Sequence, residues 1–277
     1  MTDELYLPDQ GDGSYRNPVL CCDYSDPDVI RVGDTYYMTA SSFNYVPGLP
    51  ILTSADLVNW RLVNYALPNI PEPGYEIPRH ACGVWAPAIR WHDGFFYIYY
   101  GMPDEGIYMV RAADACGQWD APKLVRAGKG LIDPCPFWDD DGRAYVIHAY
   151  ANSRIGFKSR IGIFPMSADG THAIGEDKFL FDGTANHPTI EGPKVYKRDG
   201  WYYIFAPAGG VATGWQTVLR SRRIDGEYED RIVLRQGNSR VNGPHQGAWV
   251  TAADGSDWFI HFQSRGLYAV SYTHLRA

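Results

Sequence analysis

The sequence predicts an all-β protein, and more narrowly a five-bladed β-propeller whose fifth blade is incomplete. Turn formers are abundant among its 277 residues, with 29 glycines and 19 prolines. Aromatic residues, which favour strands, make up 14% of the chain. One pattern also occurs five times: an apolar strand, a Gly/Asp turn, and a second strand that is rich in aromatic rings.

Each copy of this pattern contains a Gly-Asp or Asp-Gly pair between two strands, which is a strong short-range signal of a β-hairpin. The turn aspartates recur at intervals of roughly 50 to 60 residues, and they are Asp34, Asp93, Asp141, Asp199 and Asp254. Further strand-like runs lie between the hairpins, namely LPILTS, GIYMVRA, RIGIFPM and WQTVLRS. Each repeat therefore supplies about four strands, which favours a propeller over a sandwich.

The fifth repeat is shorter than the others. After GLYAV the chain continues only as SYTHLRA, where we find neither strand alternation nor a turn signal. We therefore predict a single propeller domain over residues 1–277. Within it, residues 269–277 form an atypical or artefactual tail in place of the outer half of the last blade.

Composition excludes several classes of partner. The formal charge of −7 is unlike that of a generic nucleic-acid binder, which needs an excess of Lys and Arg. The longest apolar stretch, around Phe95–Met102, is far shorter than the roughly 20 residues of a membrane helix. The five cysteines are odd in number and show no zinc-ligand spacing, and the N-terminus MTDELYLPDQ shows no secretion signal. These features favour a cytoplasmic protein with no membrane or nucleic-acid partner.

The most informative positions lie eight residues before each turn aspartate, and they are Asp26, Trp85, Asp133, Glu191 and Gln246. His245 directly precedes the last of them, and a proline follows within two residues in four of the five repeats. The inner strands of a propeller line its central channel, so equivalent positions converge at one end of that channel. We therefore expect three carboxylates, an indole and a His/Gln pair to share one cavity.

Each of these residues has an ordinary structural explanation when taken alone: a turn residue for an Asp-Pro, a core residue for Trp85, a structural histidine for His245. The occurrence of five such positions in one register, three of them acidic, favours a functional site instead. Neighbouring carboxylates repel one another, and this raises the pKa of at least one of them. Cleavage of a glycosidic bond needs one protonated and one ionised carboxyl. The residues alone do not assign these two roles.

The run from about Asn17 to Tyr268 resembles the catalytic domain of glycoside hydrolase family 43, close to its β-xylosidase/α-L-arabinofuranosidase branch. The segments that carry the resemblance are NPVLCCDYSDPDVIRVGDTYYMTASSFNYVPGLPI, GVWAPAIRWHDGFFYIYYG, LIDPCPFWDDDGRAYVIHAY, PTIEGPKVYKRDGWYYIFAPAGGVATGWQTVLRS and NGPHQGAWV. The resemblance implies a five-bladed propeller that inverts the anomeric configuration. This sequence departs from the family pattern at Ala269-Val270, where family members continue with Gly-Arg and further strands.

The resemblance implies a role for each acid. Asp26 corresponds to the general base, Glu191 to the general acid, and Asp133 to the acid that tunes the pKa of the general acid and orients it. For an inverting enzyme we predict a separation of roughly 6.5–9.5 Å between the carboxyl groups of Asp26 and Glu191, whereas a separation of about 5 Å would count against inversion.

The resemblance also implies contacts around the acids. Ser42, Phe43 and Trp85 correspond to the wall of the sugar pocket, and the loop from Ala206 to Trp215 is expected to overhang it. His245 is expected to be a polar residue of the active site. It is also a candidate metal ligand, because family members often hold a cation near the propeller axis. A structural calcium there would take most of its ligands from water, and the chemistry itself requires no cofactor.

Three functions remain open from the sequence. The first is an exo-acting glycosidase that releases xylose or arabinofuranose from the non-reducing end of hemicellulose oligosaccharides. The second is an endo-arabinanase of the same family, and the third is a non-catalytic sugar-binding propeller or an inactive truncated one. Three acids in one register favour an enzyme over a lectin. The long segment between Ser42 and Trp85 would favour exo action if it closes the pocket on one side. The oligomeric state is not predicted.

Overall fold

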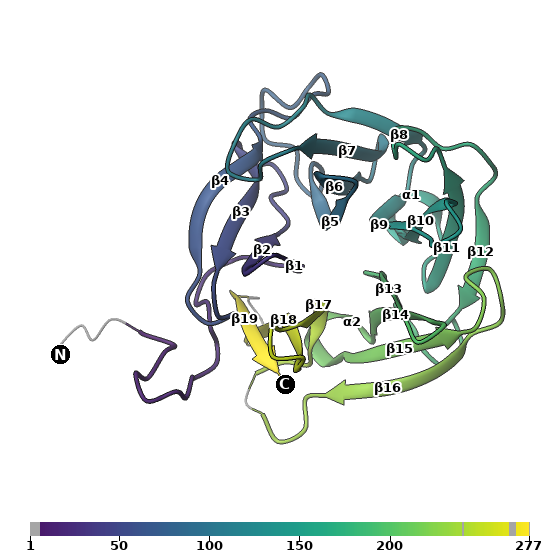
Figure 1. The fold of residues 1–277 in the computed structure, drawn as a ribbon. Helices are drawn as coiled ribbons and strands as arrows, with labels where there is room; N and C mark the ends of the chain where they lie inside the picture. The colour runs from purple at the N-terminus through teal and green to yellow at the C-terminus, as the bar shows by residue number, and fades with distance from the viewer. Residues whose placement is uncertain (1–5, 240, 266–269, 277) are drawn as a thin grey trace.

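In the computed structural model, which describes residues 6–239, 241–265 and 270–276, five antiparallel sheets surround a central axis (Figure 1). The predicted all-β propeller is therefore confirmed. The first sheet consists of β1 (Asp28–Val32), β2 (Thr35–Thr39), β3 (Gly48–Ser54) and β4 (Arg61–Leu67). The second consists of β5 (Trp85–His92), β6 (Phe95–Met102), β7 (Gly106–Ala112) and β8 (Lys123–Ala127).

The remaining sheets follow in chain order. The third consists of β9 (Leu131–Trp138), β10 (Ala144–Tyr150), β11 (Arg160–Met166) and β12 (Lys178–Asp182). The fourth consists of β13 (Lys194–Arg198), β14 (Trp201–Ala208), β15 (Trp215–Ser221) and β16 (Glu229–Arg235). The fifth has three strands in the described residues, β17 (His245–Thr251), β18 (Asp257–Arg265) and β19 (Val270–Arg276). Two four-residue helices, α1 (Asn152–Ile155) and α2 (Gly210–Thr213), lie in connections between strands.

The repeated turns form the predicted hairpins between the first and second strands of each sheet. Asp93 and Gly94 have φ values of 45° and 80°, and Asp199 and Gly200 have values of 52° and 71°. Two successive residues with positive φ are typical of the tight turns that match the twist of a hairpin. The four strand-like runs between the hairpins lie in β3, β7, β11 and β15, which are the third strands of their sheets.

The end of the chain differs from the prediction. No strand was expected after Tyr268, yet β19 pairs antiparallel with β18, from Phe259 opposite Arg276 to Arg265 opposite Val270. A strand on the edge of an existing sheet is held by backbone hydrogen bonds, so it can form without an alternating side-chain pattern. Residues 266–269 lie outside the described residues, and they include Ala269, where the sequence departs from the family pattern.

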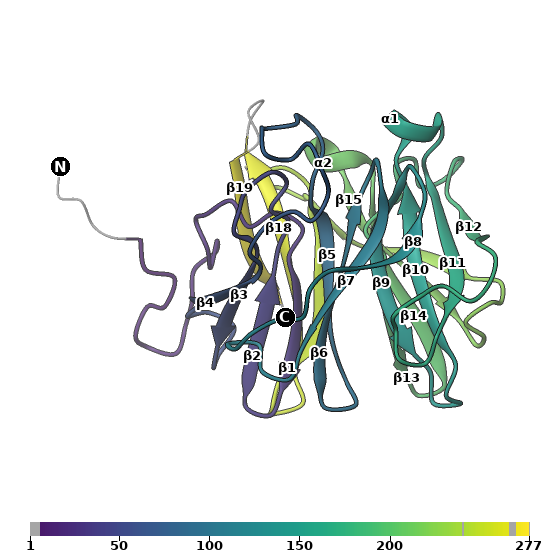
Figure 2. The ribbon, with the colours of Figure 1, turned by 90° about the horizontal axis from the view of Figure 1, so that it is seen from above.

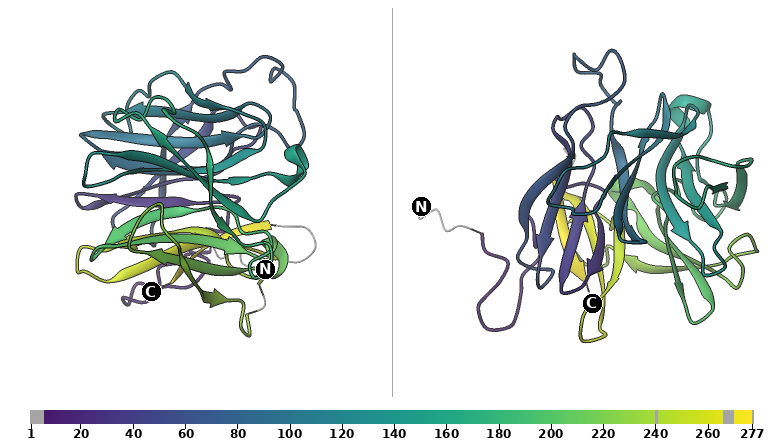
Figure 3. Two further views of the ribbon diagram at one scale, coloured as in Figure 1. Left: turned by 90° about the vertical axis from the view of Figure 1, so that its right-hand side faces the viewer. Right: turned by 45° about the horizontal axis from the view of Figure 1, so that its top comes forward.

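The sheets pack face to face around the axis, and their apolar side chains form four core clusters. The innermost strand of every sheet lies at the axis (Figure 1). Both α1 and α2 lie at one end of the molecule, and the β1–β2 and β5–β6 turns lie at the opposite end (Figure 2). The N-terminal segment from Tyr6 stands out from the sheets (Figure 3). Within the described residues, neither helix has the length or the hydropathy needed to cross a membrane.

Candidate active site

The acidic positions of the shared register lie at or next to the starts of inner strands. Asp26 stands two residues before β1, Asp133 is the third residue of β9, and Glu191 precedes β13 by three residues. Asp26 and Asp133 both have a φ of 54°, a left-handed conformation that residues other than glycine adopt rarely. Backbone strain of this kind is retained where the surroundings impose it, and functional sites are common among such places. The carboxylates of the first and third sheets therefore stand on residues with the same φ.

The structure brings the three carboxylates together. Oδ2 of Asp133 accepts a hydrogen bond of 2.8 Å from the backbone N–H of Gly192, the residue that follows Glu191. Nε2 of His245 lies 3.1 Å from Oε1 of Glu191. Asp26 interacts electrostatically with Glu191, His245 and Asp133. Acids at the first, third and fourth sheets and a histidine of the fifth sheet thus form one cluster. We call it the acid cluster, and its members are Asp26, Asp133, Glu191 and His245.

The environment of the acid cluster favours protonated groups. Burial raises the pKa of Asp133 to about 7, and the negative charges of Glu191 and Asp26 add to this effect. Burial also raises the pKa of Asp26, with a smaller contribution from Glu191. Burial lowers the pKa of His245, but its hydrogen bond with Glu191 and the nearby negative charges outweigh burial, so that this pKa is raised. A cluster of acids that holds protons near neutral pH is suited to general acid–base chemistry.

Lys194 belongs to the same environment, although the sequence pattern did not single it out. It is the first residue of β13, its side chain is fully buried, and its Nζ has no hydrogen-bond partner in the described part of the chain. Its positive charge partly offsets the effect of burial on the pKa values of Asp26 and Asp133. A buried ammonium group is costly unless opposite charges lie nearby. Lys194 is therefore the counter-charge of the acid cluster.

Ser41, rather than the predicted Ser42, contacts an acid. The Ser41 hydroxyl donates a hydrogen bond of 2.5 Å to Oδ2 of Asp26. Ser42 is buried, and its Oγ accepts a hydrogen bond of 3.1 Å from the backbone N–H of Leu49 in β3. The Ser42 hydroxyl thus braces the first sheet, while its neighbour orients the carboxylate. Two adjacent serines look alike in the sequence, and only the fold distinguishes them.

The two aromatic residues predicted for the pocket wall are joined through the backbone. Phe43, which is 36% exposed, exchanges two backbone hydrogen bonds with Val84, the residue before Trp85. A Cβ on Gly83 would lie 2.1 Å from the carbonyl oxygen of Phe43, so only glycine fits at this crossing. The indole Nε1 of Trp85 is buried and has no hydrogen-bond partner among the described residues. A donor of this kind is available to water or to a ligand.

The surroundings of His245 do not fit a calcium site built from protein ligands. Nδ1 of His245 and Oε1 of Gln246 are buried without hydrogen-bond partners in the described part of the chain. Calcium takes about six to eight oxygen ligands, and the described residues contain no group of three His, Cys, Asp or Glu side chains that could hold a metal.

The loop expected to overhang the pocket lies beside the general-acid candidate. The carbonyl oxygen of Pro207 accepts a hydrogen bond of 3.1 Å from the backbone N–H of Glu191. The loop continues through α2 and closely approaches the segment before β17, where a Cβ on Gly243 would lie 2.0 Å from the carbonyl oxygen of Gly214. The segment from Ala206 to Trp215 is therefore packed between Glu191 and the entry to the fifth sheet.

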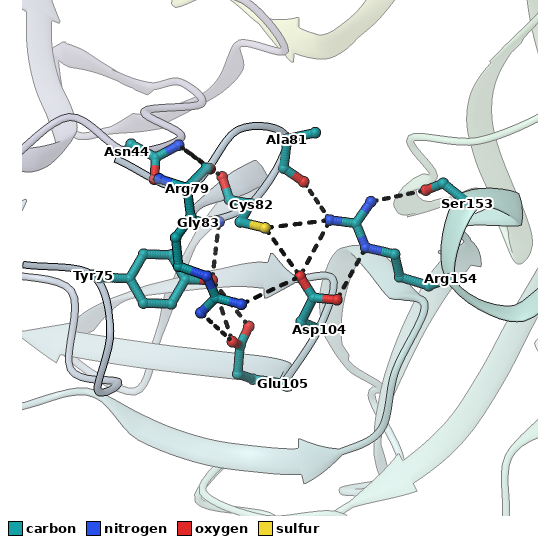
Figure 4. A network of polar contacts seen from close by, with 10 residues as sticks. All are labelled: Asn44, Tyr75, Arg79, Ala81, Cys82, Gly83, Asp104, Glu105, Ser153 and Arg154. Atoms are coloured by element: carbon teal, nitrogen blue, oxygen red, sulfur yellow. Dashed lines mark hydrogen bonds and ion pairs between the residues drawn. The ribbon is translucent and has the colours of Figure 1, made fainter. Parts of the chain in front are cut away.

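A long connection between β4 and β5, residues 68–84, forms what we call the rim loop. Arg79 of this loop stacks over the ring of Tyr75 at 4.4 Å, and its Nη1 lies 3.4 Å from Oε1 of Glu105 in the β6–β7 turn. The Tyr75 hydroxyl donates to the same carboxylate at 3.2 Å. Asn44 holds the loop from the other side, through a hydrogen bond of 2.8 Å to the carbonyl oxygen of Arg79. Figure 4 shows these contacts.

A cavity of about 490 Å³ occupies the other end of the channel. It is lined by later residues of the same inner strands, including Trp91, Trp138 and Trp249, and none of the predicted site residues lines it. The side chain of Arg90 also lines this cavity and forms an ion pair of 2.5 Å with Oδ2 of Asp28. Because it lacks the carboxylates, we do not assign the chemistry to this cavity.

Residues 15–275 match the family described as glycosyl hydrolases family 43. A putative β-xylosidase from Xylanibacter ruminicola is 51% identical over 92% of this chain and 46% of its own length. A non-reducing end α-L-arabinofuranosidase from Bacteroides ovatus is 33% identical over 79% of this chain and 41% of its own length.

The fold agrees with the same group of proteins. The crystal structure of a xylan β-1,4-xylosidase from Bacillus halodurans superposes with a TM-score of 0.84 at 28% identity, covering 94% of this chain and 53% of that one. The chain spans about half the length of the curated relatives it matches.

Proposed function

The chain belongs to glycosyl hydrolases family 43, and from this membership and its acid cluster we propose that it is an exo-acting glycosidase. Its substrates are hemicellulose-derived oligosaccharides, from which it releases xylose, arabinofuranose or both at the non-reducing end. The names of the relatives, β-xylosidase and non-reducing end α-L-arabinofuranosidase, support this substrate class. The single observation that carries the proposal is the convergence of Asp26, Asp133 and Glu191 around His245.

In the proposed mechanism, hydrolysis takes one step with inversion. Ionised Asp26 removes a proton from a water molecule as the water oxygen bonds to the anomeric carbon. The bond between that carbon and the glycosidic oxygen breaks, and the proton of Glu191 passes to the leaving oxygen. Asp26 thus gains one proton, Glu191 loses one, and exchange with solvent restores both.

The neighbours of the acids support these roles. The Ser41 hydroxyl orients the Asp26 carboxylate and opposes the effect of burial on its pKa, so that Asp26 is available as a base. Asp133 is nearly fully buried and accepts a hydrogen bond from the backbone beside Glu191. It therefore acts on the general acid through position and charge, without contacting the attacking water.

The propeller is proposed to have five blades, with β17-β18-β19 as the fifth. β17 pairs antiparallel with β18, as the inner strand of each other sheet pairs with its neighbour, and its first residue, His245, lies against Glu191. The described residues give this sheet three strands, against four in each of the others. This difference of one strand supports the proposal that the fifth blade is incomplete.

The proposed chemistry uses two carboxyl groups and water, so it requires no cofactor. No step passes through a cation. A structural calcium near the axis, as the family resemblance implies, would need water for nearly its whole coordination shell, given the donors around His245.

The function is tested by substituting Glu191→Gln and measuring hydrolysis of nitrophenyl β-xyloside, nitrophenyl α-L-arabinofuranoside and xylo-oligosaccharides side by side. We expect the unmodified chain to hydrolyse at least one of them and the variant to lose hydrolysis of xylo-oligosaccharides by a factor of about 10³ or more. Glu227→Gln, at an exposed position, is the matched control and should retain full activity. Proton NMR of the first anomer released tests inversion. Equal activity in the two variants would remove Glu191 from the role of acid.

A further inference from the structure

The rim loop, the β6–β7 turn and helix α1 meet at one carboxylate, that of Asp104 (Figure 4). These segments belong to different parts of the chain: the loop precedes the second sheet, the turn lies within it, and α1 belongs to the third sheet. Cys82 of the rim loop donates to Oδ2 of Asp104 at 3.1 Å. Arg79 of the same loop lies 3.9 Å from the same oxygen.

Arg154 of α1 completes this junction with all of its guanidinium nitrogens. Its Nε donates to Oδ1 of Asp104 at 3.1 Å and its Nη2 to Oδ2 at 3.2 Å, which is the two-point geometry of a strong arginine–carboxylate pair. Nη2 also donates to the carbonyl oxygen of Ala81, and Nη1 to the hydroxyl of Ser153 at 3.0 Å. The pair is shielded from solvent, with side-chain exposures of 13% for Arg154 and 24% for Asp104. The rim loop is therefore tied to the third sheet through one arginine.

The same guanidinium lies over the ring of Trp85, at 5.4 Å from the ring centroid. Trp85 occupies the second-sheet position of the register that supplies the acids, and its backbone neighbour Val84 pairs with Phe43. Arg154 thus holds both the loop that ends at Trp85 and the indole itself. Loss of either contact would free the rim loop or the indole at the second-sheet position of that register.

We infer that Arg154 is a positioning residue for the proposed glycosidase. Together with Asp104 it keeps the rim loop closed against Trp85, and the closed side limits the enzyme to the terminal sugar of an oligosaccharide. The inference rests on the proposed function. It adds that selection of chain ends over internal bonds depends on this ion pair, which lies outside the acid cluster.

The experiment compares Arg154→Leu and Asp104→Asn with Arg111→Leu, which removes a more exposed ion pair of the second sheet, that of Arg111 with Asp120. Nitrophenyl β-xyloside, xylotetraose and a soluble arabinoxylan are the substrates. In both test variants we expect kcat on the nitrophenyl substrate to change by less than about twofold. We expect KM for xylotetraose to rise about tenfold, and internal cleavage products of arabinoxylan to appear. Arg154→Lys should restore part of the KM, and Arg111→Leu should change neither quantity.

A second measurement tests the closure without using activity. Trypsin cleaves after arginine, and Arg79 lies in the rim loop, so we expect cleavage at Arg79 to accelerate about tenfold or more in both test variants. An unchanged cleavage rate, or equal losses of kcat on all substrates, would overturn the inference. Absence of glycoside hydrolysis by the unmodified chain, together with accelerated cleavage in the variants, would instead refute the proposed function and leave the closure standing.

Discussion

Nε2 of His245 lies 3.1 Å from Oε1 of Glu191, so the first residue of β17 is bound to the acid that precedes β13. This pair joins the fifth sheet to the fourth at the point where the chemistry is proposed. The negative charges around the imidazole make its protonated form more favourable in the folded protein than in the unfolded chain.

His245→Gln should therefore change how stability depends on pH. Since the folded pKa of His245 lies above the ordinary histidine value of 6.5, its stabilising contribution is complete below pH 6.5 and is lost as pH rises through the folded pKa. We expect the variant to be less stable than the unmodified protein by on the order of 1 kcal/mol at pH 6 and by less at pH 9. Urea denaturation at a series of pH values measures this difference. A difference that stays constant with pH would contradict the assignment.

Asp133→Asn should have the opposite effect on stability. The pKa of Asp133 is raised from 3.8 to about 7, so ionisation of this carboxyl destabilises the fold progressively as pH rises through that interval. We expect the variant to unfold with a free energy higher by on the order of 2 kcal/mol at pH 7.5, a gain that disappears as pH falls toward 4. Hydrolysis should fall at least 100-fold at the same time.

The control for this measurement is Asp34→Asn, in an exposed turn of the first sheet. It should leave both the stability and the hydrolysis unchanged. Loss of stability at neutral pH in the Asp133 variant would contradict this prediction. It would show that the hydrogen bond accepted by the carboxylate stabilises the fold by more than the buried charge destabilises it.

Lys194→Met should displace the pH profile of hydrolysis. Removing the buried positive charge raises the pKa of Asp26, and hydrolysis requires this group in its ionised form. We expect the acidic limb of kcat/KM to move upward by about one pH unit, with a loss of about tenfold at low pH that shrinks as pH rises. The exposed Lys158, changed to Met, serves as the control. A loss of the same factor at every pH would indicate a structural role only.

The parts of this site that the sequence predicts are those that repeat. The turn aspartates recur because each hairpin has an Asp/Gly pair in its turn, and counting back from them places Asp26, Asp133 and Glu191 in one register. Lys194 and Ser41 do not repeat, and their importance depends on neighbours from other sheets. The strand β19 follows from pairing with β18 through the backbone, which leaves no trace in side-chain alternation. The Arg154–Asp104 pair is likewise invisible in the sequence, since 50 positions separate the two residues.

Asp28→Asn tests the ion pair within the channel. Oδ2 of Asp28 contacts Nη1 of Arg90 at 2.5 Å and also accepts a hydrogen bond of 2.8 Å from the backbone N–H of Ile89. Removing the charge leaves a guanidinium buried without its partner, and we expect a loss of about 3 to 5 kcal/mol in the free energy of unfolding. Adding Arg90→Met to this variant should recover part of the loss in chemical denaturation. The exposed Asp225, changed to Asn, should have little effect. An unaltered stability in Asp28→Asn would show that water reaches the pair.

Arg90 has a further consequence for turnover. Its side chain reaches from the second sheet to Asp28 in the first, to the sulfur of Cys135 in the third, and over the ring of Tyr196 in the fourth. In the proposed glycosidase, these contacts place Arg90 across the channel, and we expect a released sugar to leave at the end where the acid cluster lies. We expect a monosaccharide that rebinds at the acid cluster to exclude the next chain end, and therefore to raise the apparent KM without changing kcat.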